Sequence, residues 1–288
     1  MKTLSFILFL LTSSIAWSQT QEELQAITRQ LENIYITDQQ PRIQLDSLVE
    51  KFGYNSDEVK KHWDLIRTHD SLNTLAVSAI LDKYGWLSAE QTSADANLTL
   101  FLVIQHAELP VQLKYQPMMY EAVKQGKAKG SHYALLLDRT NMYQDKLQVY
   151  GSQANMAGDS KTYLFPIADE PNVNKRRQEI GLPPLEEYAK LFGINYTLPT
   201  VDTLKGKLVI AGFVIDRNQQ VLPGVNIYIN EQLTGTTNQD GYYRFTTSLT
   251  NKFDTIVYKK EGYQVSVLPA EREGKEVIYV INMLSKTE

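Results

Sequence analysis

The sequence predicts a two-domain α plus β protein: a mainly helical N-terminal domain with a small β-hairpin, followed by a C-terminal antiparallel β-sandwich. From Gln21 to about Gly193, apolar residues recur at helical spacing, beginning with Leu24, Ile27, Leu31 and Ile34. From Lys207 onward the apolar period changes to two, as in half-buried strands. A length of 288 residues also suggests about two domains.

The N-terminus has the three parts of a cleavable secretory signal. Lys2 precedes an apolar run from Leu4 to Leu11, and polar and small residues follow. Ala16 and Ser18 fit the small-x-small cleavage pattern, so residues 1–18 are predicted to be removed and Gln19 to become the first residue. The run is shorter than the about 20 apolar residues of a membrane anchor. We therefore expect an exported protein, periplasmic or secreted, with no transmembrane segment after signal cleavage.

Composition excludes several classes of site. The chain has no cysteine, which removes disulfides, thiol nucleophiles and cysteine-based metal sites. Among its four histidines, His62 and His69 are seven apart, whereas a paired-histidine zinc helix needs a spacing of four, so no metal is expected. A net charge of −4, without a basic region, argues against a nucleic-acid partner. No phosphate-binding loop or other cofactor signature is present, so we expect no cofactor.

Start and stop signals divide the predicted helical domain, residues 19–193. The helical spacing continues past Pro41 to a stop at Gly53, and Asn55 with Glu58 forms a capping-box pattern for a long helix that ends at Gly85. Ser88 with Gln91 repeats the start signal, and Pro110 marks the next break. Further helices are expected over 111–126, 131–140 and 185–192. A short hairpin is expected over 141–153, with its turn at Gln144, Asp145 and Lys146.

A segment containing Pro199, residues 194–206, is predicted to be a linker and the most protease-sensitive part of the chain. After it, apolar residues alternate within 209–215, 225–229, 243–245 and 277–281. The turn signals "LPG" and "QDG" separate these stretches. Several short alternating strands with such turns predict a β-sandwich over residues 207–288.

The stretch "IAGFVIDRNQQVLPGVNIYINEQLTGTTNQDGYYRF" resembles the carboxypeptidase regulatory-like domain, a prealbumin-like sandwich attached to many secreted and outer-membrane bacterial proteins. The residues that carry the resemblance are Gly212, Asp216, Pro223, Gly224, Val225, Gly235, Thr236, Thr237, Asp240, Gly241 and Phe245. It implies an accessory module without peptidase chemistry. A folding or spacer role and the binding of a partner or glycan both remain open.

Three polar motifs end apolar runs in the first domain: "QHAE" after "LFLVI", "LDR" after "YALL" and "YGSQ" after "LQV". With these motifs the domain resembles a bacterial family of unknown function, over about residues 35–192. The matching residues are Gly85, Trp86, Gln105 to Ala107, Asp138, Arg139, Tyr150 to Gln153, Arg176, Arg177, Gly181, Leu182 and Tyr188. Ser152, Leu87 and Glu108 depart from the family's threonine, proline and aspartate. The resemblance identifies residues without giving them roles.

The motif residues Gln105, His106, Asp138, Arg139, Tyr150 and Gln153 are expected to meet, because each ends an apolar run that enters one core. His106 and Asp138 are the candidate catalytic residues, with His106 as general acid or base and Asp138 orienting it. The candidate binding residues are Trp86, Gln105, Arg139, Tyr150, Gln153 and Arg177. A structural alternative makes His106 a helix cap, Trp86 a packing residue and Asp138 with Arg139 a link between helices.

Three classes of function follow from these patterns. The first, which the sequence favours over the two alternatives that follow, is an exported binding or interaction protein of the cell envelope, whose helical domain carries a polar cleft for an unknown small ligand, a glycan or an envelope protein. The second is an exported hydrolase that uses His106. The third is a structural envelope protein. Convergence of the motif residues in one open cleft favours the hydrolase, and separate helix caps favour the other two classes.

Overall fold

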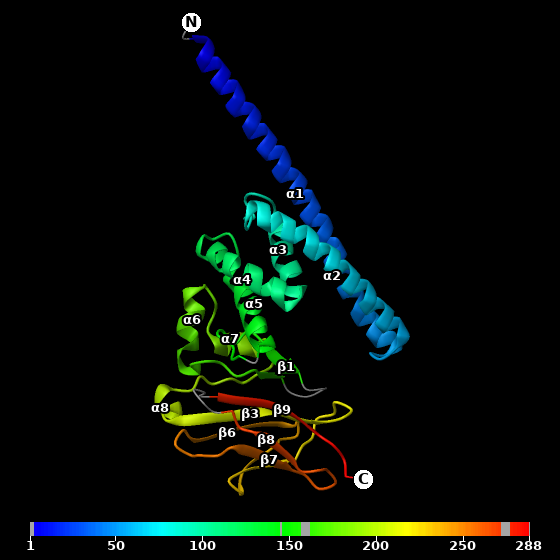
Figure 1. Ribbon diagram of the computed structural model, residues 1–288, viewed down its shortest axis with the longest axis vertical. Coiled ribbons are helices and arrows are strands. Elements are labelled where there is room, and N and C mark those ends of the chain that lie inside the picture. The colour runs from blue at the N-terminus through cyan, green and yellow to red at the C-terminus, as the bar shows by residue number, and fades with distance from the viewer. Residues whose placement is uncertain (1–2, 145, 157–161, 272–276, 288) are drawn as a thin grey trace. The chain divides into compact units, whose positions relative to one another are not determined.

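The computed structural model describes residues 3–144, 146–156, 162–271 and 277–287 (Figure 1). Its contacts divide the chain into two compact units, Met1–Thr140 and Asn141–Glu288. Within the described ranges, no helix combines the length and the apolar character that a membrane span requires.

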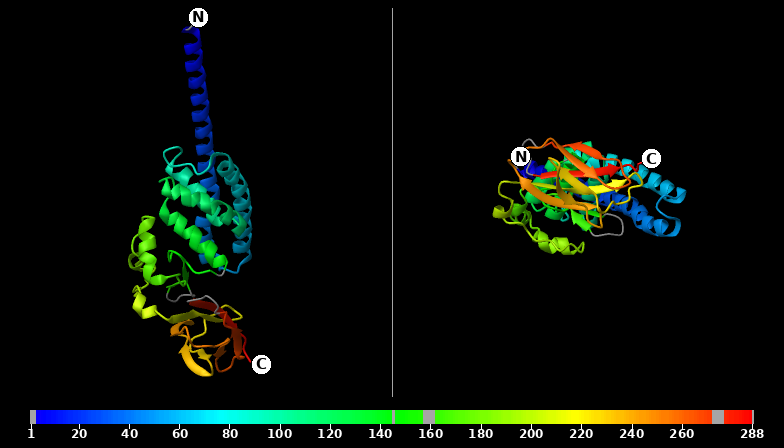
Figure 2. Two further views of the ribbon diagram at one scale, coloured as in Figure 1. Left: turned by 60° about the vertical axis from the view of Figure 1, so that its left-hand side comes forward. Right: turned by 90° about the horizontal axis from the view of Figure 1, so that it is seen from below.

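The first unit is helical. Its helices are α1 (Thr3–Phe52), α2 (Asp57–Tyr84), α3 (Ala94–His106), α4 (Leu109–Lys124) and α5 (Gly130–Tyr143), the last of which continues past Thr140. The N-terminal part of α1 runs clear of the other helices (Figure 2). The rest of α1 packs against α2 and α3. Leu31, Leu81, Leu100, Ile104 and Leu136 have no exposed surface and form the centre of this unit's core.

The structure shows which of the predicted helix starts and ends are correct. Gly85 ends α2 as predicted, with a φ of +69° that favours glycine and its N–H donating to the carbonyl of Leu81. The start of α2 is capped by Ser56 rather than Asn55. Ser88 and Gln91 exchange the two hydrogen bonds of a capping box, at 3.0 and 3.3 Å, but they close a turn. The next helix begins only at Ala94, because Ser93 accepts from the N–H of Ala96 and caps it.

The predicted hairpin over 141–153 is wrong. The helix α5 runs on to Tyr143, and the carbonyl of Asn141 then accepts from the N–H of Lys146 at 2.8 Å, so a turn closes the helix where strands were expected. Of the predicted turn residues, Asp145 lies outside the described residues. An antiparallel pair does form later, between β1 (Ala154–Met156) and β2 (Thr162–Leu164).

Two further sheets make up most of the second unit. The three-stranded sheet has the order β6 (Tyr242–Ser248), β3 (Lys207–Asp216), β9 (Val277–Leu284). The four-stranded sheet has the order β5 (Gln232–Thr236), β4 (Asn226–Ile229), β7 (Thr255–Lys259), β8 (Ser266–Pro269). One cluster of buried residues draws on both sheets, among them Ile210, Ile227 and Tyr258. The strand β9 runs parallel to β3, so this pairing departs from the antiparallel pattern predicted, and the other pairs of labelled strands in the described ranges are antiparallel.

The strand β3 is buried on both faces. Leu208 and Ile210 face the shared core, while Val209, Ala211 and Phe213, on the opposite face, are at most 2% exposed. Tyr163 packs edge-on against Phe213, with ring centres 5.7 Å apart, so the segment that precedes the sheets covers this second face.

That covering segment contains η1 (Glu170–Asn172), α6 (Val173–Glu179), α7 (Leu185–Lys190) and α8 (Val201–Leu204). It also contains the predicted linker 194–206. The compact unit therefore begins at Asn141, well before the linker, because the segment shares buried contacts with the three-stranded sheet.

Candidate functional site

The site in the first unit is built around a proline inside α1. Pro41 has no N–H, so the carbonyl of Thr37, four residues earlier, loses its usual helical partner. His69 Nδ1 on α2 lies 3.0 Å from that carbonyl oxygen, and His62 Nε2 lies 2.6 Å from the carbonyl oxygen of Pro41. Because a carbonyl oxygen only accepts, both imidazoles donate through these nitrogens. Two histidines thus join α2 to one turn of α1.

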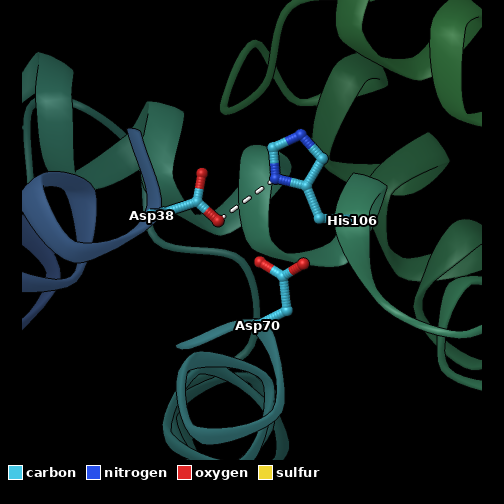
Figure 3. A group of neighbouring side chains, drawn as sticks. All are labelled: Asp38, Asp70 and His106. Atoms are coloured by element: carbon cyan, nitrogen blue, oxygen red, sulfur yellow. Dashed lines mark hydrogen bonds and ion pairs between the residues drawn. The ribbon is translucent and has the colours of Figure 1, made fainter. Parts of the chain in front are cut away.

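Asp38 lies in the same turn and is 1% exposed. Its Oδ1 lies 3.1 Å from Nδ1 of His106, the last residue of α3. Figure 3 shows Asp38, Asp70 and His106 directed toward one another from three helices. An ionised carboxylate only accepts, so Nδ1 of His106 carries a proton, and in the neutral form of the ring Nε2 keeps its lone pair.

The other ring nitrogen of His106 is the open atom of the site. Among the residues that the structure describes, Nε2 has no hydrogen-bond partner. The His106 side chain retains 20% of its accessible surface, so the ring is packed but reachable from solvent. A histidine with a carboxylate on one nitrogen and a free lone pair on the other can take up and release a proton.

Arg42 joins the two carboxylates. It lies one turn after Asp38 in α1, and its Nη2 donates to both oxygens of Asp70 on α2, at 2.7 and 2.9 Å. Its Nη1 donates to the carbonyl oxygen of Asp38 at 2.8 Å and lies 3.4 Å from Asp38 Oδ1. A hydrogen bond between two charged groups is stronger than one between neutral groups, so this contact fixes α1 against α2 beside His106.

The surroundings of Asp38 keep it ionised. Burial by itself raises the pKa of this carboxyl, but the hydrogen bond from His106, the charges of His106 and Arg42 and a hydrogen bond from Gln39 outweigh it. The result is a pKa below the ordinary value for aspartate. At neutral pH the partner of His106 is therefore a carboxylate.

Three of these groups also have the spacing of a cation site. One ligand atom each from Asp38, Asp70 and His106 lies within 4.8 Å of the others. However, the guanidinium of Arg42 already pairs with both carboxylates, and His106 Nδ1 is directed at Asp38. A divalent cation would have to displace a positive side chain and a hydrogen bond. The arrangement therefore suits proton transfer better than metal binding.

The structure brings Gln105 and Arg139 together, as the sequence predicted. Arg139 Nη1 donates to the carbonyl oxygen of Gln105 at 3.3 Å. A guanidinium only donates, so the side-chain oxygen of Gln105 faces it, and in that orientation it accepts from Arg139 Nε at 2.9 Å. Asp138, the neighbouring residue of α5, is completely buried. The carboxylate on His106 Nδ1 is Asp38, and the orienting role of Asp138 stays a prediction.

Tyr150, Gln153 and Arg177 belong to the second unit, where Arg177 contacts Tyr150. Arg177 is 1% exposed, and its Nη1 donates to the carbonyl oxygen of Tyr150 at 2.7 Å. Gln148 accepts from the N–H of Gln153 at 2.6 Å and donates to its carbonyl at 3.0 Å. Gly151, which follows Tyr150, has a φ of +66°, and an added Cβ would lie 2.7 Å from Ile167 Cδ1, so a larger residue would be strained here. The convergence of these residues with His106 stays a prediction.

A comparison with known protein families finds a match that includes most of the helical part of the chain. The model described as "Family of unknown function (DUF6624)" matches residues 26–201. The chain belongs to this family. No curated protein matches it. The DUF6624 region includes every candidate site residue and extends past Thr140 into the second unit, whereas residues 202–288 lie outside the match.

The sequence interpretation missed Asp38, Arg42 and Asp70 in the DUF6624 region. The signal for Asp38 was present, because it continues the helical spacing of Ile27, Leu31 and Ile34 on the face that α1 buries. A carboxylate on a buried stripe requires a partner. Arg42 follows it at a spacing of four, which places the two on one helix face. No local signal points to Asp70.

Trp86 of the DUF6624 region is a buried residue after the end of α2. It is 5% exposed, and its indole Nε1 has no hydrogen-bond partner in the described part of the chain. This burial agrees with the packing role that the sequence left open for it. A contact between Trp86 and a ligand stays a prediction.

Proposed function

We propose that the chain is an exported hydrolase of the cell envelope, in which the DUF6624 region uses His106 as general acid and base and Asp38 orients it. One observation carries the proposal. His106 directs Nδ1 at a buried, ionised carboxylate, while Nε2 has no partner among the described residues and the ring stays partly exposed. In this arrangement a histidine is fixed in one tautomer and ready to accept a proton.

The proton transfers follow from this tautomer. His106 Nε2 accepts a proton from water while the water oxygen forms a bond to the acyl carbon of an ester or amide, and the electrons of the carbonyl π bond move to the carbonyl oxygen until the carbonyl forms again. Asp38 stays ionised and stabilises the imidazolium that results. When the bond from the acyl carbon to the leaving group breaks, Nε2–H returns the proton to the leaving oxygen or nitrogen. The products are a carboxylic acid and an alcohol or amine, and His106 regains its starting state.

The charges of the site favour particular substrates. Asp38 and Asp70 supply two negative charges, against the one positive charge of Arg42, when His106 is neutral. A site with excess negative charge attracts neutral or cationic molecules better than anionic ones. We therefore propose an uncharged or amine-bearing ester or amide as the substrate class.

A binding function without turnover is the second candidate, and Arg42 favours it. The guanidinium holds Asp70 by both oxygens and also lies against Asp38, so His106 is the open ionisable group of this cluster. A single open imidazole can accept a hydrogen bond from a small ligand, a glycan or an envelope protein without any chemistry.

The test compares the chain from Gln19 with its variants on a panel of chromogenic esters and amides. For His106→Gln we expect a fall in kcat/KM of about 10²- to 10⁴-fold, the usual size for a lost acid–base group. Asp38→Asn should also lose activity. Asp82→Asn serves as the control, since Asp82 pairs with Lys114 on the surface.

Equal activity in His106→Gln and the unmodified chain would contradict the hydrolase proposal. Binding of a ligand that is not turned over, detected as a rise in melting temperature and lost in His106→Gln, would favour the binding function.

The proposal of export rests on Lys2, the apolar run after it and the cleavage pattern at Ala16 and Ser18. N-terminal sequencing of the exported chain should give Gln19 as the first residue, and an intact Met1 in the mature protein would contradict it. We also propose that residues 207–288 form a sandwich of the carboxypeptidase regulatory-like kind. The support is that both sheets contribute to one buried cluster.

A further inference from the structure

The last turn of α3 is held from two other helices. A helix ends with carbonyls that have no partner within the helix, and in α3, which ends at His106, the carbonyl of Gln105 is one of them. Gln112 Nε2 on α4 donates to this carbonyl oxygen at 3.0 Å, and Arg139 Nη1 on α5 donates to it at 3.3 Å. The residue before His106 is therefore fixed by α4 and α5, while Asp38 on α1 fixes the imidazole ring.

The contact that Gln112 makes carries a penalty in the stability of the fold. Its side chain is 1% exposed, and its nitrogen must face the Gln105 carbonyl because that oxygen only accepts. The amide oxygen is then buried with no partner among the described residues. A buried unpaired acceptor destabilises a fold, and an apolar side chain of similar length would avoid that penalty. Stability alone therefore does not account for a glutamine at this position.

The contact between His106 and Asp38 leaves little room for movement. Their 3.1 Å separation is near the upper end of the range for a hydrogen bond from nitrogen to oxygen. Helix ends fray, so an unsupported last turn of α3 would carry the ring out of this range part of the time. A donor that fixes the Gln105 carbonyl suppresses that movement.

We infer that Gln112 is a positioning residue for His106: by holding the carbonyl of Gln105, it keeps the imidazole bonded to Asp38 and so keeps Nε2 unprotonated. The inference rests on the proposed function of His106. Gln112 itself makes its contact with the backbone of α3.

The test uses Gln112→Met, which keeps the length of the side chain and removes the donor. Gln116→Met is the matched control, because Gln116 lies one turn later in α4 and donates to Thr140 Oγ1 of α5 at 2.7 Å, and its side chain has no hydrogen bond to α3 among the described residues. The readout is the 15N NMR signature of His106, which reports which ring nitrogen carries the proton. Gln112→Leu replaces Gln112→Met if methionine prevents folding.

In the unmodified chain and in Gln116→Met we expect the Nδ1–H tautomer of His106. In Gln112→Met the ratio of Nδ1–H to Nε2–H should fall about 2- to 10-fold, the effect of one typical hydrogen bond. Once a substrate has been identified, kcat of Gln112→Met should fall by a similar factor while KM stays unchanged.

The same tautomer ratio in Gln112→Met and Gln116→Met would overturn the positioning role of Gln112. An Nε2–H tautomer in the unmodified chain would instead contradict the proposed function. The two failures are therefore distinguishable in one set of spectra.

Discussion

The two compact units bury charged groups in different ways. In the first unit, Asp38 and Arg42 form a network that reaches His106 and leaves one ring nitrogen of that histidine open. In the second unit, Glu170 uses both carboxylate oxygens, with Oε1 accepting from Tyr196 at 2.8 Å and Oε2 accepting from Arg244 at 2.7 Å.

The difference shows how similar side chains serve stability in one place and chemistry in another. The contacts of Glu170 join the segment before the sheets to β6, and burial, with the charge of Glu170 and a hydrogen bond to it, raises the pKa of Tyr196, so its hydroxyl stays protonated. A network whose donors and acceptors are all used holds elements together. A network with an open nitrogen beside an ionised carboxylate can also exchange a proton with a bound molecule.

The largest effect on stability is expected at Arg177, which is 1% exposed and donates to the carbonyls of Tyr150 and Pro183. Arg177→Met removes the donor from the carbonyl of Tyr150, which is buried, and from that of Pro183, which is only partly buried, so we expect a loss of about 3 kcal/mol, at about 1–3 kcal/mol for each unpaired buried group. Urea denaturation measures it. A loss below about 1 kcal/mol would mean that the second unit's polar groups are not used for stability in the way described.

Arg244→Met should destabilise the second unit less. Removing one partner of a fully buried ion pair costs about 3–5 kcal/mol. The Arg244 side chain is 35% exposed and solvent screens it, so we expect about 2 kcal/mol. Arg217→Met, at an exposed arginine that donates to Ser285, is the control and should change the free energy of unfolding little. Equal losses in both variants would show that the Glu170 contacts do not bind the segment to the sheet.

His132 of the first unit should make stability depend on pH. Burial, with a smaller contribution from the charge of Lys129, lowers the pKa of His132 to about 4, and its ring stacks on Phe101 with centres 4.3 Å apart. As pH falls from about 6.5, the unfolded histidine binds a proton and the folded one does not, so stability decreases down to pH about 4.

His132→Phe should keep the stacking and remove that loss of stability, which thermal melts between pH 7 and 4 would show. The contribution of Asp38 to stability, which Asp38→Asn removes, lies in a different pH range. The lowered pKa of Asp38 contributes stability above the unfolded value for aspartate, near pH 4, and that contribution is lost only below it. An unchanged pH dependence in His132→Phe would contradict the account of His132.

The sequence predicted the features that have local causes. Gly85 ends a helix because it can adopt a positive φ, and the alternation of Val209 to Ile215 marked β3. The predicted hairpin failed because α5 continues to Tyr143, where a turn that has no strong sequence signature closes it.

The site was predictable only in part, because its contacts join residues that lie far apart in the sequence. His106 and Gln105 stood out at the end of an apolar run. Asp38 lies 68 residues before His106, and only the packing of α1 against α3 brings the two together. The packing of the segment before the sheets on the second face of β3 could not be predicted either, since the alternation of apolar residues in a strand does not show what packs on each face.

The packing of this segment on β3 and β6 changes the outcome expected from limited proteolysis. The sequence alone predicts that cleavage in 194–206 releases a stable fragment beginning near Lys207. The contacts of Tyr163 with Phe213 and of Glu170 with Arg244 instead lead us to expect that the two fragments stay associated after cleavage. Gel filtration of the nicked chain checks this. Separate elution of the fragments would mean that the second unit is two independent bodies.

The tautomer of His106 tests the central claim most directly. Asp38 accepts from Nδ1 in the structure, so 15N NMR of the unmodified chain, with the imidazole in its neutral form, should show a protonated Nδ1 and an unprotonated Nε2. Asp38→Asn should reduce this preference, while Asp82→Asn should keep it. A neutral imidazole with the proton on Nε2 in the unmodified chain, or an unchanged tautomer ratio in Asp38→Asn, would contradict the claim that Asp38 orients His106.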